Sequence, residues 1–424
     1  MFNNTLLVIA YYFPPMGLSG VQRTLKFVKY LPQFGWRALV LTVLPTSYYA
    51  FDESLNTELE LEGIEIFRAS GKNLVKQNRI KNKTVKFPSY FKQKLGRAFL
   101  QTIYMPDSKI RWKNAAIGLG EKILEEHKIN AIFATAPPFT DFLVANELSK
   151  NFGKPFVVDY RDNWVDNPFH FYPTPFHKRY CIKLESEILT RAQKAIVTTR
   201  YSKEILLKRY RFLSHDDVII VPHGYDPEDF ALDKSVEQTS EKFVITHSGL
   251  FQDNRTPKYF LKALASFVEG NPEAKKKIEA RLVGLMRPGH LKLIKKLGLE
   301  NNVLCTGYVP HSEAVKHLLE SDVLWLMLDD TIRSPGKLYE YFGARKPLLV
   351  CAPDGIIRRT AAETNAAITT DPKDERAIKR AIGTYFNLWK NDGLPVANED
   401  FAAKFDRKKL TGDLARELAL IAEV

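Results

Sequence analysis

The stretch from Ser334 to Pro347 contains residues that suit the binding of an anionic ligand. Ser334 can cap a helix, Gly336 lets a ligand approach the backbone, and Lys337 falls on the first helical turn. Glu340 follows one turn later on the same side. A helix N-terminus of this kind can hold phosphate groups while the carboxylate accepts two hydrogen bonds from a ribose diol. A capped helix with an ordinary surface glutamate explains the same spacing equally well.

Two further glycine turns lie between a short apolar run and the start of a predicted helix. Gly17 and Gly20 follow the first apolar run of the chain, and Gly249 and Arg255 follow the run over residues 243–246. The N–H groups of such a turn, with the helix N-terminus behind it, can bind an anion, and an arginine can add two hydrogen bonds to a diphosphate. Because neither turn has the GxGxxG pattern, a tight strand–helix connection and a solvated arginine remain alternative interpretations.

The elements that would position these residues alternate along the chain. Short apolar runs, typical of buried strands, alternate with segments of helical period, and this pattern predicts βαβ units and parallel sheets. About six runs fall in each half, so we expect an α/β protein with two doubly wound, Rossmann-like domains. The runs span residues 6–12, 38–43, 64–67, 131–134, 156–159 and 195–198 in the first half, and 243–246, 281–285, 303–305, 323–328, 348–351 and 367–369 in the second.

A polar segment marks the expected join between the two domains. Residues 229–242 lack periodicity and precede a new apolar run. We therefore expect an N-terminal domain over residues 1–228 and a C-terminal domain over residues 229–397. Residues 398–424 are predicted to form a final helix that packs back on the N-terminal domain, through an apolar face at helical spacing formed by Leu410, Leu414, Leu418 and Ile421.

The net charge of +13 comes mostly from one segment. Lys72–Arg97 contains nine lysines and arginines and no acidic residue, which indicates an anionic partner. Phe91, Leu95, Phe99 and Ile103 form one helical stripe, as in a helix that lies on an anionic membrane surface, although a helix packed on its own domain would show the same stripe. Nucleic acid is disfavoured as the partner because no nucleic-acid-binding motif accompanies the charge.

The apolar runs and the cysteines indicate the cellular setting. No apolar run approaches the ~20 residues that cross a bilayer. Cys181, Cys305 and Cys351 are far apart and odd in number, which suits reduced thiols and neither disulfides nor a zinc site. We expect a cytoplasmic protein, peripheral at the inner face of the cell membrane if Lys72–Arg97 binds lipid.

The chain resembles the family-4 class of retaining glycosyltransferases that build bacterial polysaccharides and glycans. The resemblance implies the GT-B fold, with two Rossmann-like domains facing each other across a cleft, the N-terminal one on the acceptor side and the C-terminal one binding the donor. It also implies transfer of a hexose-type sugar from a UDP- or GDP-sugar to a glycan or lipid-linked acceptor, by front-face substitution. Five blocks carry it in the family's order: residues 11–36, VVDYRDNW from Val157, VPHGYDPEDF from Val221, residues 305–328, and SPGKLYEYFGARKPLL from Ser334.

The resemblance assigns roles to individual residues. Glu340 matches the second glutamate of the family's Glu-x7-Glu element and would bind the donor ribose. Arg255 and Lys337, rather than a metal ion, would stabilise the leaving diphosphate, and no cofactor or metal is expected because neither an Asp-x-Asp nor an HExxH motif occurs. The other donor-binding positions are Gly17, Gly20, Gly249, Gly336, Leu338, Tyr308 and Val309, the last two through main-chain groups that contact the base.

The sequence departs from the family pattern at two positions. Ile332 replaces the first glutamate, and Asp329 or Asp330 would have to substitute for it. No histidine follows the fourth apolar run, so Asp162 is the nearest polar residue that could assist the acceptor, or it is a structural carboxylate beside Arg161. These departures keep two other functions open. A sugar-nucleotide epimerase would need no acceptor, and a non-catalytic subunit of a polysaccharide-assembly complex would turn over no donor.

Overall fold

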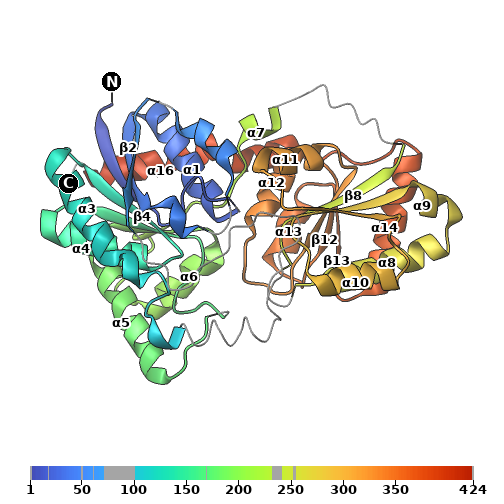
Figure 1. Ribbon diagram of the computed structural model, residues 1–424, viewed down its shortest axis with the longest axis horizontal. Helices are drawn as coiled ribbons and strands as arrows, with labels where there is room; N and C mark the ends of the chain where they lie inside the picture. The colour runs from blue at the N-terminus through green and yellow to red at the C-terminus, as the bar shows by residue number, and fades with distance from the viewer. Residues whose placement is uncertain are drawn as a thin grey trace. The chain divides into compact units, whose positions relative to one another are not determined.

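A computed structural model describes residues 2–17, 19–48, 51–60, 62–70, 101–168, 170–231, 241–251 and 255–422. The described chain forms two compact units (Figure 1). Unit 1 is drawn from Met1–Arg79, Pro88–His223 and Arg407–Val424, and the described residues of unit 2 lie within Gly224–Asp406. The chain therefore passes between units at residues 223/224 and 406/407, where the sequence suggested 228/229 and 397/398.

Unit 1 is a parallel sheet of seven strands with helices on both faces. The strand order is β3-β2-β1-β4-β5-β6-β7, and Asn4 of β1 is in register with Trp36 of β2. The strands are β1 (Asn4–Ile9), β2 (Trp36–Val43), β3 (Ile64–Ala69), β4 (Ala131–Ala136), β5 (Phe156–Tyr160), β6 (Lys194–Val197) and β7 (Val218–Ile220). The helices are α1 (Ser19–Tyr30), α3 (Lys113–Glu126), α4 (Thr140–Phe152), α5 (Pro175–Arg191), α6 (Arg200–Arg209) and α16 (Arg407–Ala422).

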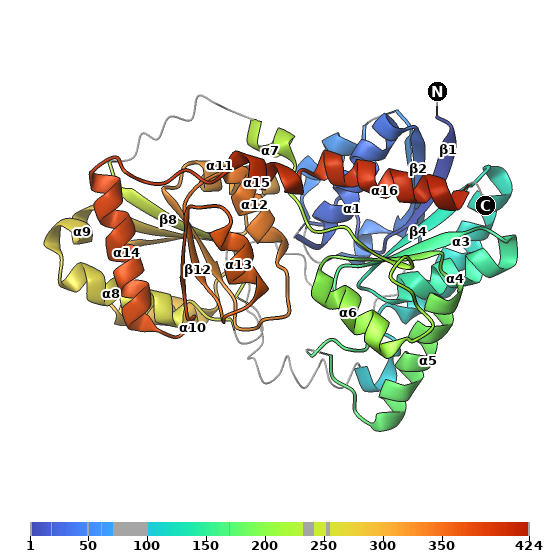
Figure 2. The ribbon, with the colours of Figure 1, turned by 180° about the vertical axis from the view of Figure 1, so that it is seen from behind.

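Helix α16 completes unit 1 from the far end of the chain. It packs against α1, and both lie on the same side of the sheet (Figures 1 and 2). Its predicted apolar face is buried, as Leu410, Leu414, Leu418 and Ile421 are each at most 5% exposed. The prediction of one helix from residue 398 onward is wrong. The short helix α15 (Glu399–Ala402) ends in a 3-10 turn because Phe401 and Phe405 pack on Phe342 of unit 2, before the chain enters α16.

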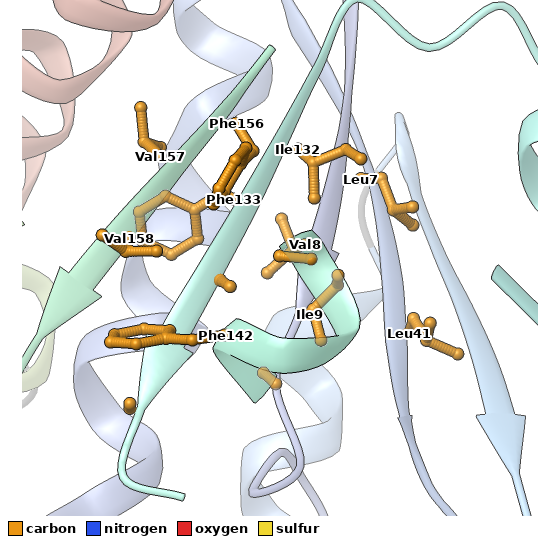
Figure 3. Packing of buried hydrophobic residues seen from close by; sticks show 14 of the residues in the cluster. Leu7, Val8, Ile9, Leu41, Ile132, Phe133, Phe142, Phe156, Val157 and Val158 are labelled. Carbon is orange, nitrogen blue, oxygen red and sulfur yellow. The ribbon is translucent and has the colours of Figure 1, made fainter. Parts of the chain in front are cut away.

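The core of unit 1 explains why its strands read as apolar runs. Val8, Ile132, Phe133 and Val158 are fully buried between the sheet and its helices (Figure 3). A parallel sheet covered on both faces needs apolar side chains at successive positions, rather than at alternate ones. Strand β7 is the one strand of unit 1 that the apolar pattern did not predict, because its three residues are too short to form a run.

Unit 2 has the same architecture around six parallel strands in the order β10-β9-β8-β11-β12-β13. The strands are β8 (Phe243–Ser248), β9 (Ile278–Val283), β10 (Val303–Gly307), β11 (Val323–Met327), β12 (Leu348–Cys351) and β13 (Ala367–Thr370). The helices besides α15 are α7 (Pro227–Ala231), α8 (Lys258–Glu269), α9 (Pro272–Lys277), α10 (Pro288–Lys296), α11 (His311–Leu319), α12 (Gly336–Ala344), α13 (Ile356–Ala362) and α14 (Glu375–Lys390). Trp325 of β11 stacks on Phe260 of α8 with their ring centroids 3.8 Å apart. This contact joins the sheet to the helix layer.

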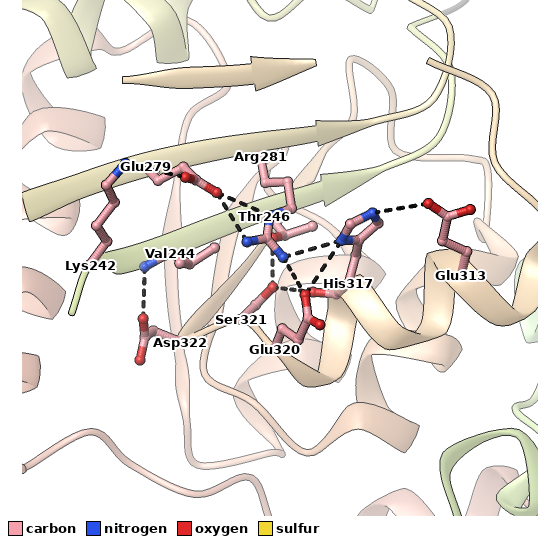
Figure 4. Close-up of polar contacts among 10 residues, drawn as sticks. All are labelled: Lys242, Val244, Thr246, Glu279, Arg281, Glu313, His317, Glu320, Ser321 and Asp322. Carbon is pink, nitrogen blue, oxygen red and sulfur yellow. Dashed lines mark hydrogen bonds and ion pairs between the residues drawn. The ribbon is translucent and has the colours of Figure 1, made fainter. Parts of the chain in front are cut away.

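A polar network attaches α11 to one face of this sheet (Figure 4). Arg281 of β9 forms salt bridges with Glu279 at 3.0 Å and with Glu320 at 2.8 Å, and it also contacts His317 of α11. The hydroxyls of Ser321 and of Thr246 on β8 form a hydrogen bond at 2.5 Å. These contacts fix α11 and the loop after it, so that β11 enters the sheet at a defined position. Among the described residues of both units, no helix has the length and apolar character that a membrane span requires.

Candidate functional site

The strand order of unit 2 reverses between β8 and β11, and the predicted site residues lie around this point. Doubly wound sheets bind ligands at the carboxyl ends of the strands where the order reverses. Gly249 follows β8 directly, and residues 328–335 connect β11 to α12. The structure therefore brings together the regions of Gly249, Gly336, Lys337 and Glu340, as the sequence predicted from separate motifs.

Gly249 permits a very close approach of Lys337. Gly249 has a φ of +121°, and a Cβ atom placed on it would lie 1.8 Å from Lys337 Nζ. Its N–H donates to the Val283 carbonyl at 2.7 Å, and a Cβ on Gly284 would lie 2.9 Å from the Gly249 carbonyl oxygen. A side chain at residue 249 would thus displace the lysine, and only glycine satisfies both the backbone conformation and the contact.

Burial and charge tune the ammonium group at this point. Burial, and after it the charge of the nearby Arg255, lower the pKa of Lys337 to about 7, while Glu340 opposes this shift. The three charged residues predicted for donor binding are therefore close enough to influence one another. An anion between Arg255 and Lys337 would replace their mutual repulsion by attraction, which is the electrostatic requirement of a diphosphate site.

This pKa makes anion binding depend on pH. A bound diphosphate favours the charged lysine, so it binds the protonated form more tightly, and above the free pKa of about 7 binding must take up a proton. We expect UDP affinity to fall by up to about tenfold per pH unit as the pH rises above about 7. Calorimetry in two buffers of different ionisation enthalpy should show proton uptake at about pH 8.5 in wild type and none in Lys337→Arg. A flat affinity profile across this range would contradict the assignment.

Residues outside the predicted set hold α12 in place. The Tyr341 hydroxyl accepts a hydrogen bond from Ser248 N at 2.9 Å and donates one to the Trp325 carbonyl at 3.2 Å. It therefore links the end of β8 and the middle of β11 to α12. His247, which is 3% exposed, donates from Nδ1 to the same carbonyl at 2.9 Å and stacks on Phe251. Burial lowers the pKa of His247 well below its usual value, and Lys337 adds to the effect, so the ring is neutral.

The start of α12 differs in detail from the prediction. Ser334 does not cap the helix: Pro335 occupies the N-cap position, and the Ser334 hydroxyl lies 2.8 Å from the Tyr339 hydroxyl. Leu338 is fully buried, and its N–H donates to the Pro335 carbonyl at 3.0 Å. Of the predicted first-turn positions, Gly336 and Lys337 thus remain the better placed to present N–H groups to a phosphate.

The two aspartates near Ile332 contact Arg333. Arg333 lies 2.8 Å from Asp329 and 2.6 Å from Asp330. Asp330 also accepts hydrogen bonds from the N–H groups of Ile332 and Arg333 at 2.9 and 2.8 Å. Asp330 therefore stabilises the turn between β11 and α12, which makes Asp329 the better of the two candidates to replace the missing glutamate.

The positions predicted for the base lie at the edge of the sheet. Tyr308 and Val309 follow β10, which is separated from β8 by β9. Gly307 has a φ of +77° and forms a bridge with Gly284, the glycine that lies beside Gly249. The loop after β8 therefore contacts the loop after β9, which in turn contacts the end of β10. Contact of Tyr308 and Val309 with a base stays a prediction.

The remaining predicted residues belong to unit 1. Its strand order reverses between β1 and β4, and Gly17 is buried while Gly20 is exposed in the first turn of α1. Arg161 joins this turn to the end of β4, because its guanidinium donates to the carbonyls of Gly20, Ala136 and Pro137. Asp162 is exposed. Burial lowers the pKa of Arg161 while Asp159 and Asp162 raise it, so Asp162 at least stabilises this guanidinium.

A buried ion pair in unit 1 was not foreseen from the sequence. Arg23 of α1 is 1% exposed and Asp159 of β5 is 0% exposed, and their side chains meet at 2.8 Å. Asp159 also accepts from the Thr135 hydroxyl at 2.8 Å, and Arg23 donates to the carbonyls of Val221 and Pro222. The pair thus fixes Val221 and Pro222, just before the chain leaves unit 1 at His223. The position of an arginine between the apolar residues Val21 and Leu25 was the signal available in the sequence.

Almost the whole chain is similar to solved GT-B glycosyltransferases. HepE of Anabaena, solved in complex with UDP and glucose, is 16% identical over 98% of this chain and 100% of that chain, with a TM-score of 0.66. Sucrose-phosphate synthase of Thermosynechococcus elongatus is 14% identical over 99% and 100%, with a TM-score of 0.66. WaaG, a glycosyltransferase involved in lipopolysaccharide biosynthesis, is 13% identical over 97% and 99%, with a TM-score of 0.63. The fold is therefore the predicted GT-B fold with two Rossmann-like domains.

Family models give the class of enzyme. Residues 81–229 match the model described as Glycosyltransferase Family 4, and residues 229–392 match that of Glycosyl transferases group 1. No curated protein has a matching sequence. The chain is a glycosyltransferase of the GT-B type.

Proposed function

We propose that the protein transfers a hexose-type sugar from a UDP- or GDP-sugar, with retention of configuration, to a glycan or lipid-linked acceptor. The observation that carries the proposal is the group formed by Arg255, Lys337 and Glu340 at the point where unit 2 reverses its strand order. The complex of HepE with UDP and glucose supports a UDP-sugar as donor.

In the proposed mechanism, two cations act on the leaving group. Arg255 and Lys337 bind the diphosphate together with the first N–H groups of α12, so that charge developing on it during bond cleavage is stabilised. This arrangement supplies the role that a divalent metal has in other transferases, and we propose that neither a metal nor a cofactor is required. The acceptor hydroxyl attacks the face of the sugar from which the diphosphate leaves, which gives retention.

Glu340 is proposed to bind the donor ribose. A charged hydrogen-bond partner contributes about 1.5–3 kcal/mol, so Glu340→Gln should weaken UDP-sugar binding by about 10- to 150-fold. The variant should fold normally because Glu340 is only partly buried on α12. Calorimetric titration with UDP and with UDP-2′-deoxy analogues measures this, and the variant should discriminate between them less than wild type does. Equal UDP affinity in variant and wild type would exclude Glu340 from the site.

One experiment tests the proposed function as a whole. Thermal shifts with a panel of sugar nucleotides should select the donor, since a specific ligand raises the melting temperature with its concentration. Transfer from that donor to membrane extracts is then followed with and without a chelator, and the anomeric configuration of the product is read by NMR. An inverted product, or transfer that is lost in chelator and restored by Mg²⁺, would contradict the retaining or the metal-independent part of the proposal.

A non-catalytic role in polysaccharide assembly is the second candidate. The observation that favours it is Ile332, together with the contact of both nearby aspartates with Arg333. This role predicts binding of a sugar nucleotide without turnover of any donor, whereas the proposed enzyme releases UDP or GDP.

We also propose that the protein acts at the cytoplasmic face of the membrane, where lipid-linked acceptors are found.

A further inference from the structure

Large apolar side chains are exposed together at the N-terminal end of α5 in unit 1. Ile103 is 52% exposed, Phe171 46%, Phe176 67% and Tyr180 39%. Single exposed apolar residues are normal on a soluble protein, but a contiguous group marks an interaction surface. We call these four residues the α5 tip.

Hydrogen bonds place the segment that contains Ile103 beside the start of α5, although residue 103 is far from α5 in sequence. Phe171 N donates to the Gln101 side chain at 3.2 Å, and His177 Nε2 donates to the Thr102 carbonyl at 3.2 Å. The rings of Phe176 and Tyr180 stack along α5 with centroids 6.5 Å apart. Both views show the turquoise helical segment around residue 103 beside the end of α5 (Figures 1 and 2).

Positive charge surrounds the α5 tip. The stretch 167–183 contains no acidic residue, and its three charged side chains, Lys178, Arg179 and Lys183, are all exposed. Lys183 is 73% exposed even though it is 3.8 Å from Glu187. In the sequence, Gln101 lies four residues after the basic segment Lys72–Arg97. That segment is outside the described residues. The partner of this surface must therefore be both apolar and anionic.

An anionic lipid bilayer has this chemistry. Aromatic rings prefer the headgroup level of a membrane, and lysine and arginine beside them attract anionic lipids. A second copy of the chain would bring the same positive charges against themselves, which disfavours self-association through the α5 tip. We infer that the α5 tip docks unit 1 onto a bilayer rich in anionic phospholipid. The inference rests on the proposed function, since it would bring the enzyme to a lipid-linked acceptor.

Vesicle co-sedimentation of the full chain tests the inference. Wild type should bind phosphatidylcholine vesicles that contain about 30% phosphatidylglycerol, bind pure phosphatidylcholine weakly, and dissociate at about 0.5 M salt, where electrostatic attraction is screened. Each basic side chain near the surface contributes about fivefold, so charge reversal should weaken binding by more than about 100-fold. The variant combines Lys178→Glu, Arg179→Glu and Lys183→Glu. Its matched control reverses three exposed lysines of α10 in unit 2, Lys292, Lys295 and Lys296, with the same change in net charge.

A second variant tests the apolar part of the surface. Burial of about 60 Å² of ring surface corresponds to about tenfold in partitioning, so the combination of Phe171→Ser, Phe176→Ser and Tyr180→Ser should weaken vesicle binding by two orders of magnitude or more. The matched control removes three exposed apolar side chains elsewhere on unit 1, Tyr201, Phe212 and Leu420, which are 44%, 51% and 61% exposed. Melting temperatures of all variants should stay close to that of wild type, because the changed side chains are exposed.

Three results would overturn the inference. The first is wild-type vesicle binding by the serine variant, and the second is equal loss of binding in the controls. The third is that wild type prefers single-stranded nucleic acid to vesicles, or that the serine variant loses a dimer and keeps its vesicle binding. Release of UDP from donor in solution is measured in parallel. If it is normal while vesicle binding is absent, the docking surface fails and the proposed function stands.

Discussion

Replacement of Lys337 by methionine is expected to lower sugar transfer by about 10²–10³-fold, because removal of one preorganised donor at a developing negative charge costs about 3–4 kcal/mol. Methionine keeps the apolar contacts of a side chain whose ammonium lies against Gly249. Burial already disfavours the charged form of Lys337 in the free protein and lowers its pKa, so its removal should not reduce the melting temperature. Initial rates should show a larger fall in kcat than rise in KM, since the charge acts mainly on the leaving group.

Arg255→Met should act in the same way, and the double variant should lose less than the product of the two effects because both cations act on one diphosphate. Lys292→Met on α10 is the matched control: it removes an equal charge from an exposed position of the same unit and should leave the rate unchanged. A rate within about twofold of wild type for Lys337→Met would show that this lysine does not act on the leaving group.

Arg23→Met is expected to lower the free energy of unfolding of unit 1 by about 3–5 kcal/mol, the usual cost of leaving one member of a buried ion pair without its partner. Asp159 would keep a carboxylate at 0% exposure, with the Thr135 hydroxyl as a neutral donor. For a unit of this size the melting temperature should fall by about 6–20 °C. Because Arg23 also holds the carbonyls of Val221 and Pro222, the chain before residue 224 should become more accessible to protease.

The exposed pair Arg200–Glu204 provides the control for this prediction. Its side chains are 86% and 58% exposed, and Arg200→Met should cost less than about 1 kcal/mol. Adding Asp159→Leu to Arg23→Met should recover part of the loss, since an apolar pair avoids the unpaired buried charge. If Arg23→Met unfolds at the wild-type temperature, or the second change destabilises it further, the buried pair does not have the assigned role.

The fold could be predicted almost entirely from the apolar runs. Twelve of the thirteen strands in the described part of the chain correspond to runs, and the run 348–351 matches β12 to the residue. This success has a physical cause, because strands buried on both faces are apolar at most of their successive positions. Failures occurred where a segment was too short, as in β7, or where two packing environments met, as between α15 and α16.

The site could be predicted only in part, because the sequence shows spacing within one element but not contact between elements. Gly336, Lys337 and Glu340 lie within one helix, and their common side followed from the helical period. The contact of Tyr341 with Ser248 joins residues 93 apart, and that of Arg23 with Asp159 joins residues 136 apart. Tyr341 reads as part of an apolar helix face and Arg23 as a charged residue of α1, and the polar end of each finds its partner only when the sheet has formed.

The position of α16 in unit 1 has a consequence for synthesis of the protein. Residues 407–422 leave the ribosome after all of residues 224–406, yet their leucines belong to the same hydrophobic core as β1, β4 and α1. Unit 2 is continuous in its described part, so its core needs no segment that is made after Asp406. The half of the protein that is made first must wait for the last helix, with the α1 surface uncovered in the nascent chain. We expect chaperones that bind nascent chains to contact α1 for longer than any helix of unit 2.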